Sequence, residues 1–275
     1  MVFIATANWW VQFISFEAER DFAEPYVRFF SDTDDFSDED YLVQEWLQGI
    51  AEKVVEQEDL PDDFEVEVHY VRSPEVNAFA TLGGHVYILS GLVAGLPDEN
   101  SLAMVVAHEV AHIKNRDALT SVSRGIAIQL ILSGLAEVRS SPETFAGYGS
   151  EAVLFAYSRE QEQAADIDAA HALAASYGGA HGITTFFELT KPEDENSDEY
   201  LEWLQSHPDH EDRLAYLYQL IQDEGWDAGE PLSYPEFVGD ALNWLDDLEE
   251  EPKETAPSET EDAAGPAAEE LIVKL

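Results

Sequence analysis

Cysteine is absent from the 275 residues, which excludes disulfide bonds, thiolate metal ligands and a lipid-modified cysteine. Basic residues are scarce, because 13 Lys and Arg stand against 58 Asp and Glu, for a formal net charge of -45. The chain lacks the basic stripe that nucleic acids require, so we expect no nucleic-acid partner. The acidic residues are spread along the chain, and their mutual repulsion opposes folding unless salt screens it. The charge therefore predicts either a high-salt environment, as in a halophile, or an acidic surface that recruits basic partners.

No apolar run in the chain reaches the length that spans a bilayer. Residues 1–16 carry no charge and are rich in apolar side chains, but they are short of the ~18 to 20 residues required, and no Lys or Arg precedes them as in a secretory signal. Three interpretations remain: an element packed on the protein body, a peripheral membrane contact, or the trimmed remnant of an anchor. We therefore expect a soluble chain, either cytoplasmic or exported to the periplasm or beyond, in a high-salt organism and with a membrane association left open.

Two histidines and a glutamate stand together in an apolar stretch, as His108-Glu109-Val110-Ala111-His112. On a helix, residues four apart lie about 40° apart around the axis and about 6 Å along it, so both imidazoles can reach one ion. This is the HExxH pattern of zinc peptidases, in which the histidines bind the metal and the glutamate acts on its water. We predict His108 and His112 as zinc ligands and Glu109 as the catalytic base.

A catalytic zinc site needs a third protein ligand. The metzincin pattern, with a glycine and a third histidine after the motif, is excluded because those positions are Asn115 and Ala118. A later glutamate is the alternative, and Glu162 has Asp166 one turn further on to support it. Such acidic pairs are common on solvated faces of an acidic chain. Glu162 is the preferred ligand, and Glu160 is the substitute.

Apolar residues around this pair, among them Ala164 and Ile167, indicate a mostly buried helix. Buried carboxylates require a cation or another partner. The burial therefore favours a metal ligand over a solvated face.

Further motifs occur before and after these residues. Asn77-Ala78-Phe79-Ala80 precedes Gly83-Gly84, Ser158-Arg159 precedes Glu162 and Asp166, and Ser206-His207-Pro208 precedes Arg213-Leu214. In this order and spacing, and with the HExxH motif, the chain resembles the HtpX/BepA-type zinc metallopeptidases, a gluzincin family, over roughly residues 40 to 225.

The resemblance implies one zinc ion per chain, bound by His108, His112 and Glu162. It implies Glu109 as the base, Asp166 as the carboxylate behind the ligands, and His207 as a residue near the metal. It also implies endopeptidase action on misfolded or misassembled proteins, as in protein quality control.

Residues 76–82 and 85–89 read as a hairpin around Gly83-Gly84. Its outer edge can pair with an extended substrate backbone, although an ordinary sheet element fits the residues equally well. The candidate substrate-binding residues are Asn77, Ala78, Phe79 and Ala80. His85 follows the turn and is a weaker candidate, whereas His69, on an alternating strand, is expected to be structural.

His207 precedes a proline, in a turn that can deliver its imidazole to the cleft. Two roles are open for it. It can donate a hydrogen bond to the oxyanion, or it can occupy the fourth position on zinc as a latch that keeps the resting enzyme latent. We favour the latch, because the sequence shows no inhibitory prosegment.

The predicted fold is α+β, a mainly helical zincin with a small sheet beside the cleft. Hydrophobic periodicity predicts a strand over 65–71 and six helices: 41–57, one from about 100, 120–137, one that contains Glu162 and ends near 177, 182–189 and 211–224. Residues 140–150 link two of these helices and are a candidate lid. We expect an N-terminal apolar and acidic extension over 1–40, a zinc metallopeptidase domain over 41–248 and a disordered acidic tail over 249–275.

The predicted activity is that of a zinc-dependent metalloendopeptidase acting on unfolded or misassembled protein chains. The competing class is a non-catalytic zinc-binding chaperone or adaptor with the same fold. Glu109 favours the enzyme, because an adaptor has no need of a base.

Overall fold

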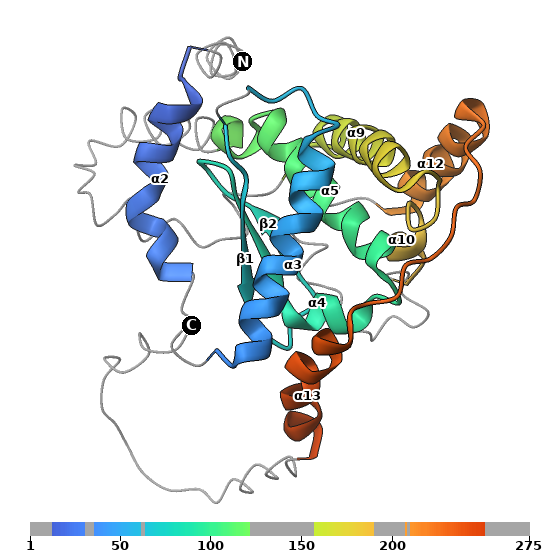
Figure 1. The fold of residues 1–275 in the computed structure, drawn as a ribbon. Helices are drawn as coiled ribbons and strands as arrows, with labels where there is room; N and C mark the ends of the chain where they lie inside the picture. Colours follow the sequence, from blue (N-terminus) through green and yellow to red (C-terminus); the bar gives the residue numbers. More distant parts are fainter. Residues whose placement is uncertain are drawn as a thin grey trace, which may run out of the picture.

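A computed structural model describes residues 13–30, 36–61, 64–121, 157–189, 207 and 210–250. In these residues a three-stranded sheet lies among helices, which confirms the α+β fold class (Figure 1). The strand order is β1-β3-β2. β1 (Glu67–Val71) runs parallel to β3 (His85–Leu89), and β2 (Ala78–Ala80) runs antiparallel to β3. The predicted strand and hairpin are therefore confirmed, with β2 as an edge strand.

Glycine is required in the turn between β2 and β3. Gly83 and Gly84 have φ angles of 82° and 89°, in the left-handed region that other residues rarely adopt. A Cβ atom on Gly84 would also lie 2.7 Å from the Phe64 ring. The hairpin therefore depends on both glycines.

Two helices cover one face of the sheet. α3 (Asp38–Val55) begins at a capping box formed by Ser37 and Asp40, and it packs on β1. α5 (Glu99–Lys114) packs on β2, β3 and α3, and all of its residues except Lys114 are buried. A helix that is buried on all sides lies at the centre of a fold, and this is the position of α5. The predicted helices over 41–57 and from about 100 are confirmed.

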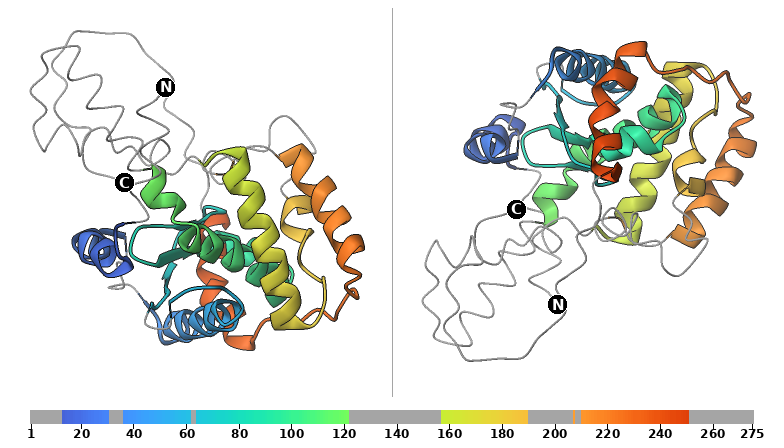
Figure 2. Two further views of the ribbon diagram at one scale, coloured as in Figure 1. Left: turned by 90° about the horizontal axis from the view of Figure 1, so that it is seen from above. Right: turned by 90° about the horizontal axis from the view of Figure 1, so that it is seen from below.

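α9 (Arg159–Tyr177) packs along α5 and also contacts α3, and α12 (His210–Glu224) lies beside α9 (Figure 2). Ser158 caps α9 through a capping box with Gln161, and Gly178 ends the helix in the left-handed conformation. These two helices were expected from the sequence. α10 (Thr185–Leu189) is shorter than the predicted 182–189, because residues 181–184 form a turn.

Three helices were not predicted: α2 (Phe16–Phe30), α4 (Ser90–Gly95) and α13 (Glu236–Glu250). α13 packs on α3 and includes the first two residues of the predicted tail. The structure describes only part of residues 1–16 and of the predicted 120–137 helix, and the proposed lid over 140–150 lies outside the described residues. Within the described ranges, no helix is both long and apolar enough to cross a membrane.

Candidate metal centre

The three predicted ligands come together between α5 and α9. The Nε2 atoms of His108 and His112 are 3.0 Å apart, because the two histidines are one turn apart on α5. The Glu162 carboxylate, from the first turn of α9, lies 3.4 Å from His108 Nε2 and 3.7 Å from His112 Nε2. All three side chains are buried. Two imidazoles and a carboxylate converging in this way suit a small divalent cation.

Each histidine has a carboxylate behind it. His108 Nδ1 lies 2.9 Å from Asp166 Oδ1, and His112 Nδ1 lies 2.8 Å from Asp117 Oδ2. Such partners fix the ring orientation and leave Nε2 directed at the shared point between α5 and α9. Asp166 was expected in this position, and Asp117 was not. Gln161, the capping residue of α9, donates to the other Asp117 oxygen at 2.5 Å.

Arg213 links Glu162 and Asp166 of α9. From α12 its guanidinium donates to both Asp166 oxygens, at 2.6 and 2.7 Å, and its Nη1 lies 2.9 Å from Glu162 Oε2. Tyr216, one turn further along α12, also donates to Asp166. α12 therefore fixes both carboxylates on the side away from the ligand atoms of the histidines.

Glu109 lies between the candidate ligands and the sheet edge. Its Oε2 accepts a hydrogen bond of 2.7 Å from the backbone N–H of Ala80 in β2. Its side chain is fully buried, and burial raises the pKa of this carboxyl to about 8. A carboxylate with a raised pKa can accept a proton and later return it.

His207 joins the same cluster. Its Nδ1 lies 3.0 Å from Glu162 Oε1 and 3.3 Å from His108 Nε2, and its Nε2 lies 3.5 Å from Glu109 Oε1. Four side chains, those of His108, His112, Glu162 and His207, thus present ligand atoms within 4.8 Å of one another. Burial lowers the pKa of His207 to about 3, so its imidazole is neutral.

The cluster concentrates negative charge that requires a cation. Burial alone would raise the pKa of Asp166, but the Arg213 charge and the contact with His108 lower it to about 2. Burial alone would lower the pKa of His108, yet its hydrogen bonds with Asp166 and Glu162 raise it to about 9. A proton on His108 therefore satisfies the carboxylates when no metal is bound, and the donor set fits a divalent cation that takes the place of this proton.

Two expectations from the sequence were wrong. Glu160, the substitute ligand, is exposed and lies outside the cluster. Ala164 is exposed as well, because it lies on the side of α9 opposite the buried face that contains Glu162 and Asp166. The helix is amphipathic rather than mostly buried.

Tyr157 was not predicted as part of the site. Its ring stacks on His112 with 3.9 Å between centroids.

The four candidate substrate-binding residues lie on β2 or beside it. The backbone groups of Asn77, Phe79 and Thr81 face β3, as the bonds Leu89 N–H to Asn77 O and Thr81 N–H to His85 O indicate. In an antiparallel pair the alternate residues point outward, so Ala78 and Ala80 present their backbone groups at the free edge. Their side chains are buried.

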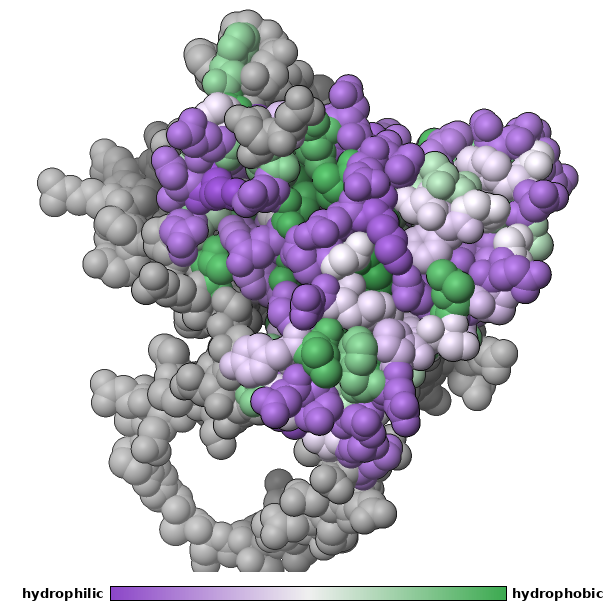
Figure 3. Space-filling model, in the orientation of Figure 1, coloured by the Kyte–Doolittle hydropathy of each residue, from purple (hydrophilic) through white to green (hydrophobic). Residues whose placement is uncertain are grey.

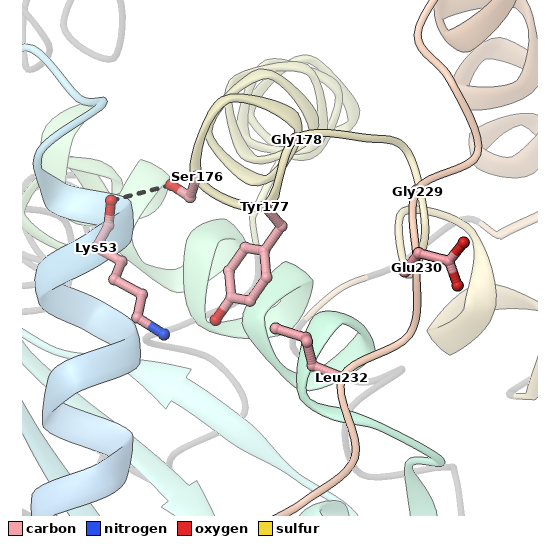
Figure 4. Close-up of a pocket in the computed structure, with 7 residues that line it drawn as sticks. All are labelled: Lys53, Ser176, Tyr177, Gly178, Gly229, Glu230 and Leu232. Atoms are coloured by element: carbon pink, nitrogen blue, oxygen red, sulfur yellow. Dashed lines mark hydrogen bonds between the residues drawn. The ribbon is translucent and has the colours of Figure 1, made fainter.

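A pocket of about 390 Å³ lies elsewhere, between the end of α9 and the segment before α13 (Figure 4). It is lined by Lys53, Ser176, Tyr177, Gly178, Gly229, Glu230 and Leu232. Tyr177 is about 22 Å along α9 from Glu162, at about 1.5 Å per residue. The pocket is therefore separate from the metal centre.

The fold and this centre together define a metallopeptidase. The model of peptidase family M48 matches residues 42–221, well over half of the chain, and the chain belongs to this family. It is 29% identical over 156 residues to the beta-barrel assembly-enhancing protease of Escherichia coli K12, covering 53% of this chain and 32% of that protein.

Two further relatives are similar to the chain. Identity is 24% over 162 residues with the mitochondrial metalloendopeptidase OMA1 of Schizosaccharomyces pombe, covering 58% of this chain and 48% of that protein. It is 35% over 127 residues with a protease HtpX homolog of Acidiphilium cryptum, covering 38% and 43%. The chain thus matches less than half the length of each of these relatives.

Proposed function

We propose that the chain is a zinc-dependent endopeptidase in which His108, His112 and Glu162 bind one catalytic zinc ion. The observation that carries this proposal is the convergence of the three buried donors beside Glu109. Two histidines and one glutamate are a common protein ligand set of catalytic zinc. Bound zinc would supply Lewis acidity, lowering the pKa of water to near 7 and polarising the scissile carbonyl.

Glu109 is the general base in this proposal. Its carboxylate accepts a proton from the attacking water and then delivers it to the leaving amine as the peptide C–N bond breaks. Ala80 N–H fixes one of its oxygens, which leaves the other oxygen for the proton transfer. The rigid position on α5 keeps the base beside the ligands throughout the reaction.

The substrate is an extended segment of an unfolded or misassembled protein, bound along β2. Ala78 and Ala80 present backbone groups at the free edge, where a substrate strand adds to the sheet. Because Ala80 N–H donates to Glu109, a chain paired with Ala78 and with the carbonyl of Ala80 passes directly beside the base. Asn77 contributes a buried side-chain oxygen, Oδ1, that lacks a hydrogen-bond partner among the described residues. Phe79 stacks on Tyr87 and stiffens the strand.

This substrate class is consistent with the name of the related beta-barrel assembly-enhancing protease. A protease that acts on this substrate class would belong to protein quality control. Strand addition requires substrate backbone that is free of other pairing, and unfolded chains provide it.

His207 would serve as a fourth ligand of the zinc ion and so keep the resting enzyme latent. Its Nδ1 faces the ligand group, at 3.0 Å from Glu162 and 3.3 Å from His108, while its Nε2 faces Glu109 at 3.5 Å. Substitution His207→Ala should raise the rate of cleavage of a short peptide with zinc content unchanged. A large loss of turnover with zinc retained would instead indicate that His207 stabilises the oxyanion.

The net charge of -45 supports function in a salt-rich medium. Hydrophilic side chains cover much of the described surface in the view of Figure 3, and hydrophobic ones form small separate groups. Salt screens such a surface and removes the repulsion that opposes folding.

Metal removal tests the proposed activity. The full chain, treated with a chelator and dialysed in high salt, should lose cleavage of a dye-labelled unfolded protein and regain it with added zinc. Metal analysis of the same samples relates activity to bound zinc. Full activity in metal-free protein would overturn the proposal, and binding of unfolded chains without any cleavage would indicate an adaptor.

A further inference from the structure

A second group of potential metal ligands lies on the opposite face of the sheet from α3 and α5. Glu67 and His69 are two residues apart on β1 and therefore share a face. His85, the first residue of β3, is the register partner of Glu67 and joins them. The buried side chains of Val68, Tyr70 and Val86 alternate with these three and face the core. The topology thus places two histidines and a glutamate side by side.

The ligand atoms of this group have the separations that a single ion requires. His69 Nε2 is 3.0 Å from His85 Nδ1, and the Glu67 oxygens lie 3.5 Å from His85 Nδ1 and 4.0 Å from His69 Nε2. Tetrahedral zinc with ligands at about 2.0–2.1 Å has ligand atoms roughly 3.3 Å apart.

The catalytic centre provides an internal comparison. There the corresponding separations are 3.0, 3.4 and 3.7 Å, also for two imidazoles and a carboxylate. The two groups therefore have nearly the same geometry, although only one of them contains the HExxH motif.

The surroundings of the two histidines favour metal binding. Both rings are buried, and His69 stacks on Tyr87 with 4.7 Å between centroids, which fixes its plane. Burial disfavours a charge on either ring, and a neutral imidazole has a lone pair to donate to a metal ion. Glu67 is more than half exposed, and it contributes negative charge and an opening to solvent.

Neighbouring charges do not block the group. Arg20 of α2 is the nearest cation among the described residues that affect His85, and it donates to the carbonyl of Gly83 at 3.2 Å. It also lies 3.9 Å from Glu65. Glu24, from the same helix, adds a negative charge near His85.

We propose that Glu67, His69 and His85 bind a second divalent transition-metal ion of the zinc class, through His69 Nε2, His85 Nδ1 and one oxygen of Glu67. The ion joins β1 to β3, and β3 carries the edge strand β2. It is a structural ion: it stabilises the sheet that presents the substrate edge and takes no part in the proposed hydrolysis. The alternative is a hydrogen bond between two neutral imidazoles, with no affinity for metal.

Metal stoichiometry tests this proposal on the full chain. Metal-free protein titrated with zinc or Co²⁺ should bind about two equivalents, and His85→Gln or His69→Gln should bind about one. The matched control is His171→Gln, an exposed histidine in neither group, which should still bind two. Zinc added beyond the first equivalent should also raise the melting temperature of the wild type, and it should raise that of His85→Gln less.

Two further variants separate this site from the catalytic one. Glu162→Ala should lose the catalytic equivalent and keep the other, whereas His69→Gln should lose the structural equivalent and keep peptidase activity. If a histidine variant fails to fold, Glu67→Gln at the exposed position should weaken only the structural equivalent. One equivalent in wild type, or an unchanged titration in Glu67→Gln and His85→Gln, would overturn the second site without affecting the proposed peptidase.

Discussion

At the scale of single residues, the candidate centre depends on which carboxylate of α9 faces α5. Glu162 is buried against both histidines, and Glu160 is exposed two residues earlier. Glu162→Ala should therefore lower zinc affinity and melting temperature together, since a ligand bound to the native state stabilises it. Glu160→Ala is the matched control and should change neither.

The same measurements assess the carboxylate behind His108. Asp166→Asn should reduce zinc affinity or activity by about 10- to 100-fold, as changes behind a ligand do. Unchanged zinc content in Glu162→Ala would show that the third ligand is a different residue.

The metal-free centre should make stability depend on pH. Burial opposes a charge on His108, but its hydrogen bonds with Asp166 and Glu162 raise its pKa to about 9. The unfolded chain has a histidine pKa of about 6.5, so the proton held by His108 in the folded state stabilises it fully below about pH 6.5. This stabilisation is lost as the pH rises through the folded-state pKa of about 9. The free energy of unfolding of the chelated protein should fall by on the order of 3 kcal/mol over that range.

Denaturant titrations of chelated and zinc-loaded protein measure this effect. Zinc replaces the proton on His108, so the loaded protein should lack the decline. A metal-free protein whose stability stays constant or increases between about pH 6.5 and about pH 9 would contradict the assigned interactions.

The ligand residues could be predicted from the sequence because a helix fixes their spacing. His108 and His112 are four apart, as are Glu162 and Asp166, and each pair shares one helix face. Asp117 could not be predicted in this way. It lies five residues after His112 and reaches it only because Arg116 adopts a φ of 58° after the end of α5. An acidic residue in the turn that follows the motif was the available signal.

At the scale of secondary structure, one edge of β2 pairs with β3 and the other edge is free for the proposed substrate strand. Ala78 directs its backbone N–H to the free edge, where proline is tolerated. Ala78→Pro should therefore retain the fold and lower kcat/KM for unfolded substrates by about 10-fold, the value of roughly one hydrogen bond. The ratio kcat/KM is measured from initial rates at low substrate concentration.

Phe79→Pro is the matched variant on the same strand. Phe79 faces Tyr87 in the register of β2 and β3, so proline there removes a bond of the sheet and should lower the melting temperature. Equal kcat/KM in Ala78→Pro and wild type would argue against substrate pairing at this edge.

The elements that carry the site were predictable, and several peripheral ones were not. α3, α5 and α9 have apolar periodicity or a capping box, and the hairpin has its glycine pair. α13 was missed because its acidic residues resemble the tail that follows it, although it packs on α3. Its burial against α3 is a tertiary effect that local sequence does not encode.

At the scale of the whole molecule, the net charge of -45 should make folding depend on salt. The Debye length falls from about 30 Å at 0.01 M to about 3 Å at 1 M, so repulsion between surface carboxylates fades over this range. The melting temperature should therefore rise steeply from dilute buffer to molar salt. Thermal scans in a series of KCl concentrations measure this, and a constant melting temperature would contradict adaptation to a salt-rich medium.

The central claim, that Glu109 is the base of a zinc peptidase, is tested most directly by turnover of Glu109→Gln. Wild type and variant are compared at equal zinc content, in high salt, with the same labelled unfolded protein. Glutamine preserves the shape of the side chain but cannot accept the proton, so the variant should keep its zinc and its melting temperature and lose at least about 100-fold in turnover. Equal turnover in the two proteins would contradict the account.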